Sequence, residues 1–275
     1  MKALLDGDIL VYRVAFTTED ADVGIAYWRM DELLKKILEG VQAEEFQVYL
    51  TASNDSTAFR KQVYTEYKAN RKAPRPVHYQ ALRQYLIDKW GASVSTTIEA
   101  DDAIGIDSRF NNDSSVIVSI DKDLLQLPGR HYNFVKEQFT DVNTHSGMRF
   151  FYKQLLMGDK ADNIKGVEGI GEVKAERILN SADDYCEEAW FDIVRKTYDN
   201  DEEMWRNGEC LLILQKTFPL GTFSYHPLGS QLIPEGIILP LYLQKQNADT
   251  SEYIIQEIST DGLQLAGLNQ VAATT

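Results

Sequence analysis

Carboxylates are concentrated in four short motifs of the chain, at spacings that could support metal chemistry. In "IEADDAIGI", residues 98–106, three acidic side chains stand within four positions and run directly into apolar residues. Together the four motifs contain Asp6; Glu99, Asp101 and Asp102; Asp121 and Asp123; and Asp159 and Asp162. Like charges at such spacing repel one another, and a buried unpaired carboxylate is costly, so the crowding predicts a cationic partner.

The chemistry of these side chains favours one class of ion. A set of carboxylates without histidine suits hard divalent cations such as Mg²⁺ or Mn²⁺ and disfavours zinc. Two such ions roughly 3.5–4 Å apart are a common device for phosphodiester hydrolysis, in which one activates water and the other stabilises the leaving oxygen. Any single motif is more often a helix cap or a turn, but the four together favour a metal site.

A basic segment, residues 59–76, reads "FRKQVYTEYKANRKAPRP". Six basic residues face one acidic residue, Glu66, which gives a local charge balance of +5. The six are Arg60, Lys61, Lys68, Arg71, Lys72 and Arg75. Such a run is usually a solvated surface, but the interleaved Tyr64 and Tyr67 favour nucleic acid, because aromatic rings stack on bases beside the phosphate contacts.

The glycine-rich stretch "GVEGIG", Gly166 to Gly171, follows a helical pattern, which excludes a dinucleotide-binding fingerprint. It is an ordinary helix–helix turn or a phosphate-binding turn. Lys165 precedes it, and Lys174 and Arg177 follow at i, i+3. Small residues let the backbone approach a phosphate, and the next helix offers its N-terminal amides.

Apolar strand patterns alternate with amphipathic helical patterns over the first half of the chain. Strands are predicted at residues 2–6, 46–50 and 115–121. One helix is predicted with Leu33, Leu34, Ile37 and Leu38 on one face and a stop at Gly40. Others are predicted from Leu82 to Trp90, with a stop at Gly91, and from Glu99 onward. This alternation predicts an α/β fold with a central, mainly parallel sheet. Ligands bind at the carboxyl edge of such sheets, so we expect the four acidic motifs to converge there.

Composition limits the class of protein. The 275 residues are 44% apolar and 25% charged, as in soluble globular proteins, and no run approaches the roughly 18 apolar residues of a membrane span, so no membrane partner is expected. Cys186 and Cys210 lack metal-ligand spacing and are expected as reduced thiols in a cytoplasmic protein. The net charge of −14 argues against a polyanionic partner, but binding depends on local charge, which is positive in the basic segment.

Five motifs occur in the order typical of the structure-specific 5′-nucleases, a family that this chain therefore resembles. They are "LLDGD", "FRKQVYTEYKANRKAPRP", "EADDAIGI", "VSIDKDLLQLPG" and "GDKADNIKGVEGIGEVKAERIL". The family includes flap endonucleases, the 5′-nuclease domain of bacterial DNA polymerase I, and bacteriophage 5′–3′ exonucleases, which "YKANRKAPRP" and the compact size resemble most. The resemblance runs to about Leu179 and assigns nothing beyond Ser181.

The resemblance implies a domain organisation. Residues 1–147 would form a PIN-like α/β nuclease core, and residues 148–217 a helix-hairpin-helix lobe that binds duplex. The basic segment, within residues 52–90, would belong to an arch through or under which a 5′-ended strand passes. Residues 218–275 would be a C-terminal extension of unknown role.

The resemblance also implies roles for side chains. The eight carboxylates of the four motifs match the family's ligands for two or more Mg²⁺ or Mn²⁺ ions, and Asp6, Glu99 and Asp121 count among the catalytic residues. Lys68 and Arg71 match basic residues near the scissile phosphate, opposite the acidic cluster, and Tyr67 matches an aromatic that stacks on a base. The hairpin Gly166 to Gly171 would hold duplex backbone, with K⁺ bridging carbonyls and phosphate. The residues expected to bind nucleic acid are Arg60, Tyr67, Lys68, Arg71, Lys72, Lys165, Gly166, Gly169, Gly171, Lys174 and Arg177.

One position departs from the family pattern. Thr51 stands where the family has an aspartate directly after the second strand, and Asp55, four residues on, is a candidate to supply that carboxylate. Asp8 is a metal ligand, a supporting group or a helix cap.

The resulting hypothesis is an Mg²⁺-dependent 5′–3′ exodeoxyribonuclease with flap endonuclease activity, acting by a two-metal mechanism in phage DNA replication or host DNA degradation. We expect a monomer, in the host cytoplasm if phage-encoded, that acts on DNA with a free 5′ end, as duplex, nick or flap, or on an RNA–DNA hybrid. A PIN-type ribonuclease or RNase H-like enzyme would not need the hairpin. A non-catalytic branched-DNA binder predicts damaged carboxylates, and a structural cation-binding protein leaves the basic segment unexplained.

Overall fold

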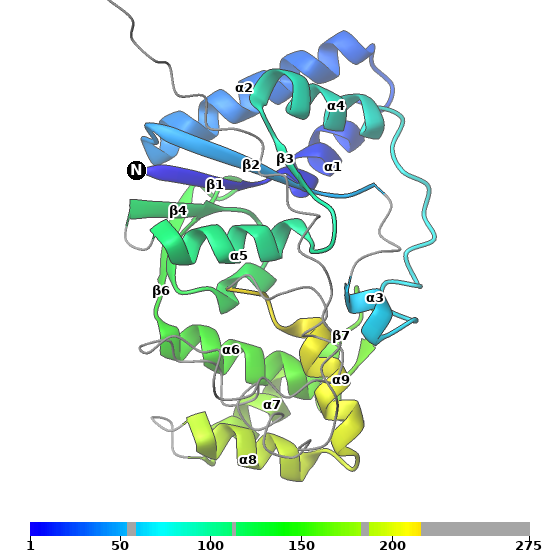
Figure 1. Cartoon of the computed structure of the whole chain (residues 1–275), viewed down its shortest axis with the longest axis vertical. Helices are drawn as coiled ribbons and strands as arrows, with labels where there is room; N and C mark the ends of the chain where they lie inside the picture. The colour runs from blue at the N-terminus through cyan, green and yellow to red at the C-terminus, as the bar shows by residue number, and fades with distance from the viewer. Residues whose placement is uncertain (54–58, 112–113, 183–186, 216–275) are drawn as a thin grey trace, which may run out of the picture.

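The computed structural model describes residues 1–53, 59–111, 114–182 and 187–215, which form a sheet-based core and a helical lobe (Figure 1). The sheet has the strand order β3-β2-β1-β4-β5-β6. Its strands are β1 Lys2–Asp6, β2 Glu45–Thr51, β3 Ser93–Ser95, β4 Ser115–Val118, β5 Gly129–Asn133 and β6 Gln138–Val142. All neighbours are parallel except β5 and β6, so the predicted α/β fold with a mainly parallel sheet is confirmed.

The central strands are apolar because both faces of the sheet are covered. Four of the five residues of β1 and all four of β4 are buried, as expected for strands inside a parallel sheet. Leu5 of β1 pairs in register with Val48 and Val118, so the three strands end close to one edge. Asp6 ends β1 there.

Helices cover the two faces of the sheet with separate apolar cores. On one face lie α1 Gly7–Thr17, α2 Val23–Val41 and α4 Tyr79–Trp90, which bury Leu10, Leu34 and Leu86 against the strands. On the other lie α5 Ala100–Asn111 and the short 3₁₀ helix η3 Asp123–Gln126, which bury Ile104 and Leu124 with Ile117.

Two helices were predicted to end at a glycine, one at Gly91 and the other at Gly40. Helix α4 ends at Gly91, whose φ of 64° is the left-handed C-cap that glycine adopts freely, as predicted. Helix α2 does not stop at Gly40. It continues to Val41, and Gln42 takes the left-handed cap at φ 53°. Gly40 instead faces the Tyr132 hydroxyl, 2.8 Å from where a Cβ would stand.

The helical lobe follows the sheet and contains the predicted helix, hairpin and helix. Its elements are α6 Thr144–Met157, β7 Gly158–Asp159, β8 Ile164–Lys165, α7 Glu172–Leu179, α8 Glu187–Thr197 and α9 Asp201–Leu211. Tyr152, Trp190 and Phe191 fill its core. Helix α6 begins at Thr144, behind a capping box of Asn143 and Ser146, so a boundary at residue 148 falls inside this helix.

The segment predicted as an arch, residues 52–90, is divided between two places. Helix α4 packs on the sheet core and is not part of an arch. Helix α3 Phe59–Val63 and the turns after it lie beside α9 and the β7–β8 hairpin (Figure 1), where Tyr67 joins the apolar core of the lobe. None of the described helices is long and apolar enough to cross a membrane.

Candidate active site

The carboxyl edge of the sheet brings Asp6 and Asp121 together. Asp6 caps α1 by accepting from the Ile9 amide at 3.1 Å, and it accepts from the Ser119 hydroxyl at 2.9 Å. Burial and the charges of Asp8 and Asp121 raise the pKa of Asp6 to about 7. Asp6 therefore holds its proton more tightly than an isolated aspartate does.

The loop after β4 presents Asp123 to the lobe. The Asp123 amide donates to Asp121 at 3.0 Å, and Gln154 Nε2 of α6 donates to the Asp123 carboxylate at 2.6 Å. Burial, followed by the charges of Asp121 and Asp159, raises the pKa of Asp123 to about 7. The charge of Asp159 in the lobe thus affects the pKa of Asp123 in the core, which places the two acidic motifs near each other.

The third acidic motif sits at the start of α5, and Thr51 supports it. The Thr51 hydroxyl accepts from the Ala100 amide at 3.0 Å. Burial, followed by the charge of Asp102, raises the pKa of Asp101 well above its usual range. Thr51, where an aspartate was expected, therefore fixes the helix start.

Asp102 was predicted as a metal ligand, but the structure buries it completely in contacts with the protein itself. Arg60 donates to both of its oxygens, at 2.5 and 2.7 Å, and the Leu214 amide donates to it at 3.0 Å. These bonds leave Asp102 directed into the protein, so we replace the ligand assignment by a structural one.

Arg60 was predicted to contact nucleic acid, and this prediction does not agree with its position. The side chain is 2% exposed, and it also donates to the carbonyls of Cys210 at 2.8 Å and Leu212 at 2.9 Å. Burial lowers its pKa, but the Asp102 charge and others raise it well above normal, so it stays a cation inside the protein.

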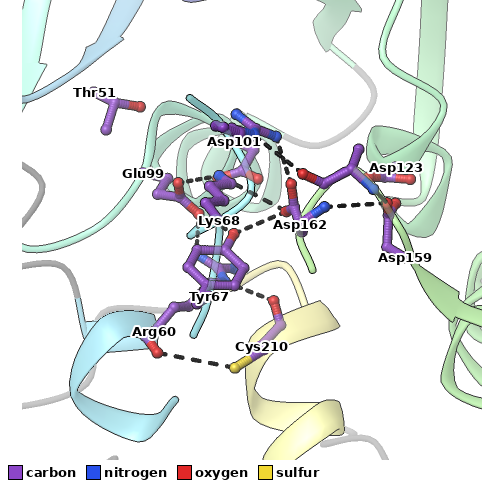
Figure 2. A network of polar contacts seen from close by, with 12 residues as sticks. Thr51, Arg60, Tyr67, Lys68, Glu99, Asp101, Asp123, Asp159, Asp162 and Cys210 are labelled. Carbon is purple, nitrogen blue, oxygen red and sulfur yellow. Dashed lines mark hydrogen bonds and ion pairs between the residues drawn. The ribbon is translucent and has the colours of Figure 1, made fainter. Parts of the chain in front are cut away.

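Glu99 belongs to a network of polar contacts that also includes Lys68, Tyr67 and Arg60 (Figure 2). It accepts from Lys68 Nζ, from the Tyr67 hydroxyl at 2.7 Å and from Arg60 at 3.2 Å. Burial alone would raise its pKa, but the charges of Lys68 and Arg60 lower the pKa of Glu99 to about 2. Glu99 is therefore ionised throughout the neutral range.

Tyr67 was predicted to stack on a base, whereas its ring is 2% exposed within the lobe core. Its hydroxyl oxygen lies 2.7 Å from a Glu99 oxygen and 3.0 Å from an Asp162 oxygen, and its single proton is donated to one of the two at a time. A ring packed in this way cannot lie against a base, so the stacking role is withdrawn.

Lys68 and Arg71 reach the acidic cluster directly, rather than standing opposite it. Lys68 pairs with Glu99 and lies 3.8 Å from Asp162, while Arg71 pairs with Asp162. Burial lowers the pKa of Lys68, but the charges of Glu99 and Asp162 raise it above normal. Lys72, next along the chain, is exposed.

The three glycines of the hairpin, Gly166, Gly169 and Gly171, differ in their surroundings and backbone conformation. A Cβ on Gly166 would meet backbone atoms of Met157 at 2.2 Å, so this glycine serves packing. Gly169 has a φ of 72°, and Gly171 is open and caps α7. The remaining predicted contacts, Lys165, Lys174 and Arg177, are exposed around it.

The donor set fits a hard divalent cation by its chemistry, since every candidate ligand is a carboxylate oxygen. Within the described ranges, no three or more His, Cys, Asp and Glu side chains are arranged so that they could hold a metal ion. Two of the candidate ligands, Glu99 and Asp162, are paired with Lys68 and Arg71. Burial is the largest cause of the raised pKa values of Asp6, Asp101 and Asp123, and the charges of neighbouring carboxylates add to it.

Asp8 and Asp55 were the two further candidates for metal ligands. Asp8 accepts from Arg83 at 2.7 Å and from the Thr51 amide at 2.9 Å, so it supports the strand end and is not a free ligand. Asp55 lies outside the described residues.

Sequence reasoning missed three supporting side chains. They are Ser119, which donates to Asp6; Gln154, which donates to Asp123; and Arg83, which pairs with Asp8. Ser119 is two residues before Asp121 in the same motif, which was a usable signal. Gln154 and Arg83 lie on helices whose orientation the sequence does not give.

A family model described as "5′–3′ exonuclease, N-terminal resolvase-like domain" matches residues 2–154. The chain is 29% identical over 205 residues to a 5′–3′ exonuclease of Bacillus subtilis, covering 64% of this chain and 68% of that protein. It is 32% identical over 206 residues to DNA polymerase I of Bacillus caldotenax, covering 64% of this chain but only 23% of the polymerase.

Solved structures show the same fold. The T5 D15 protein co-crystallised with metal ions superposes with a TM-score of 0.60 at 20% identity, covering 76% of this chain and 89% of that one. A T5 D15 flap endonuclease complex with DNA and metal ions gives a TM-score of 0.57 at 20% identity, covering 76% and 89%.

Proposed function

We propose, from the premise that this chain belongs to the 5′–3′ exonuclease family, that it hydrolyses phosphodiester bonds near the 5′ ends of DNA. The activity would be that of a 5′–3′ exonuclease with flap endonuclease character. The chain spans about a quarter of its polymerase relative, so only the nuclease part of that protein is relevant.

One observation carries the proposal: acidic motifs from both the sheet core and the lobe act on one another at the carboxyl edge of the sheet, beside Lys68. Burial is the largest cause of the raised pKa of both Asp6 and Asp123. The charges of Asp8 and Asp121 add to it at Asp6, and those of Asp121 and Asp159 add to it at Asp123. Such crowding is expected where a protein prepares a site for added cations and for a phosphate.

The group that this site would take is a pair of Mg²⁺ or Mn²⁺ ions. Asp6, Asp101, Asp121, Asp123 and Asp159 would hold them, with Glu99 and Asp162 once these release Lys68 and Arg71. When bound, the ions would supply an activated water and neutralise charge on the leaving oxygen.

The chain's own cations would then act on the phosphate. Lys68 and Arg71 would exchange their carboxylate partners for phosphate oxygens, because both side chains already lie at the edge of the cluster. Fixed positive charge beside the phosphate stabilises the charge that develops in the transition state. The rate at saturating DNA would therefore depend on both residues.

The lobe would orient the duplex next to the site. Exposed Lys165, Lys174 and Arg177 surround the glycine hairpin, and Gly171 leaves open space at the N-terminus of α7. Backbone amides at a helix start bind phosphate, and K⁺ at this hairpin would add a further contact.

Core and lobe would divide at about residue 143, because helix α6 of the lobe begins at Thr144. Residues 218–275 would be a separate extension.

The decisive experiment is cleavage of 5′-labelled flap, nicked, blunt-duplex and RNA–DNA hybrid substrates, with Mg²⁺ and with EDTA. We expect short 5′ products from DNA in Mg²⁺ only, and no cleavage by an Asp121→Asn variant that still binds DNA in Ca²⁺. Asp20→Asn, at the exposed turn before α2, is the matched control and should cleave normally. Cleavage of RNA alone would favour a ribonuclease, and binding without cleavage would favour a branched-DNA binder.

A further inference from the structure

Two asparagines tie the basic segment to the acidic loop between β7 and β8. Asn70 Nδ2 donates to the Lys160 carbonyl at 2.7 Å, and Asn163 Nδ2 donates to the Glu66 carbonyl at 2.8 Å. The two bonds are reciprocal, because each segment supplies one side-chain donor and one backbone acceptor. We call this pair of bonds the asparagine clamp.

The clamp holds the two residues that would act on the phosphate. Lys68 lies between Glu66 and Asn70, and its amide donates to the Asp162 carbonyl at 2.9 Å. Arg71 directly follows Asn70, and its Nε donates to the Ala161 carbonyl at 3.2 Å. Residues 66–71 and 160–163 therefore form one hydrogen-bonded unit. The place of Lys68 relative to Asp162 is set inside that unit.

The backbone on both sides of the clamp is held in an uncommon conformation. Lys68 has a φ of 56° and Asn163 a φ of 60°, in the left-handed region that few non-glycine residues adopt. Asparagine adopts this conformation at low cost, because its short polar side chain can form local hydrogen bonds. The lysine side chain offers no such compensation. Strain of this kind persists only where neighbouring contacts hold the residue in place, and it gathers at functional sites.

We propose that Asn70 and Asn163 are positioning residues for the cleavage reaction. Together they hold residues 66–71 against residues 160–163, so that Lys68 and Arg71 meet the phosphate at a fixed place beside the carboxylates. This inference rests on the proposed function. Both asparagine amides donate to the protein's own backbone, so their effect on the phosphate is exerted through Lys68 and Arg71.

The direct test removes each side-chain amide. Asn163→Gly keeps the positive φ at no steric cost, and Asn70→Ala removes an exposed side chain. A misplacement of about 1 Å costs on the order of 100-fold in rate, so we expect single-turnover cleavage of saturating flap DNA to fall about 10- to 100-fold. The dissociation constant for the same DNA in Ca²⁺ should stay within about twofold, because the phosphate anchors elsewhere are unchanged.

Glu66→Ala is the matched control. It removes an exposed side chain from the same segment but leaves the backbone carbonyl that accepts from Asn163. We expect an unchanged rate. A loss as large as that of Asn163→Gly would mean that the segment tolerates no change, and it would overturn the clamp.

A double-mutant cycle separates positioning from general damage. In a Lys68→Ala background, Asn163→Gly should cost much less than it does in the wild type, because one of the groups that the clamp positions is already gone. An equal loss in both backgrounds would indicate a structural defect and contradict the proposal.

Hydrogen exchange gives a readout that needs no cleavage. The Lys68 amide should exchange faster in Asn70→Ala and Asn163→Gly than in the wild type or Glu66→Ala, since its bond to Asp162 loosens. Faster exchange with an undiminished cleavage rate would overturn the positioning role alone. A wild type that cleaves none of the four substrates would overturn the proposed function itself.

Discussion

At the scale of single residues, the chain's own cations and the divalent ions that the site would bind compete for the same carboxylates. Glu99 is held by Lys68, and Asp102 by the buried Arg60. These two pairs differ in kind. The Lys68 side chain is 16% exposed, so DNA could reach it, whereas Arg60 is enclosed at 2%.

Lys68→Ala should therefore slow chemistry rather than weaken binding. Loss of one preorganised charge at the phosphate typically costs about 10²–10³-fold in rate, and we expect a loss of this order in single-turnover cleavage at saturating DNA. Lys72→Ala, four residues on and exposed, is the comparison. It should lower affinity and the salt dependence of binding while leaving the rate at saturation unchanged. Equal effects of the two variants would make Lys68 a simple phosphate anchor.

Arg60→Met should destabilise the protein, because it leaves Asp102 buried without its partner. Breaking a buried ion pair from one side costs about 3–5 kcal/mol, which urea unfolding would measure. Lys35→Met breaks the exposed pair with Glu32 instead, and should cost less than about 1 kcal/mol. A small loss for Arg60→Met would show that water reaches Asp102 readily.

At the scale of elements, the hairpin between α6 and α7 combines a packed glycine with an open one. Gly166→Ala would push a methyl group into the backbone of Met157 and Gly158, at 2.2 and 2.3 Å. Gly171→Ala meets nothing within 4 Å. The first variant should lose stability by several kcal/mol, whereas the second should fold normally and lose only duplex affinity. Thermal melts and duplex binding in Ca²⁺ distinguish these outcomes, and equal melts would show that the hairpin is not fixed by this contact.

The elements that sequence reasoning predicted well are those that local pattern controls. The buried strand ending at Asp6 follows from an apolar run. The strand predicted over residues 115–121 ends at Val118, so Asp121 lies in the loop after it. The carboxyl-edge rule for parallel sheets puts both aspartates on the same side of the sheet. The antiparallel pair β5 and β6 was missed, because β6 is mostly exposed and carries little apolar signal.

The roles that failed depend on contacts between distant segments. Arg60 and Tyr67 have the residue types of a DNA-binding surface, yet α9 and the residues after it enclose Arg60, and the lobe core encloses Tyr67. No local pattern around residue 60 predicts the Cys210 carbonyl 150 positions away. The asparagine clamp was missed for the same reason.

At the scale of the whole molecule, charge is unevenly distributed: a net −14 coexists with a basic segment docked on the acidic edge. This arrangement predicts that stability responds to divalent ions. Mg²⁺ held by the folded site and not by the unfolded chain should raise the melting temperature in proportion to the logarithm of its concentration once above the dissociation constant. An unchanged melting temperature up to 10-fold above the concentration that supports cleavage would contradict a site at this edge.

The same charges predict how stability depends on pH when the protein is kept in EDTA. The pKa values of Asp6 and Asp123 are about 7 in the folded protein, against an ordinary 3.8. A raised pKa means that the folded state binds protons more tightly, so this contribution to stability is present below pH 4 and is lost as pH rises through about 7. Glu99, with its lowered pKa, titrates below this window. Between pH 5 and pH 8 the melting temperature in EDTA should therefore fall, and it should fall less in an Asp6→Asn, Asp123→Asn variant, whose side chains do not titrate. Mg²⁺ should flatten the wild-type curve, because it replaces the protons as the positive partner of both carboxylates. A wild type and a variant with the same slope in EDTA would show that the two carboxyls are ionised without metal, and that the basic segment alone balances the cluster.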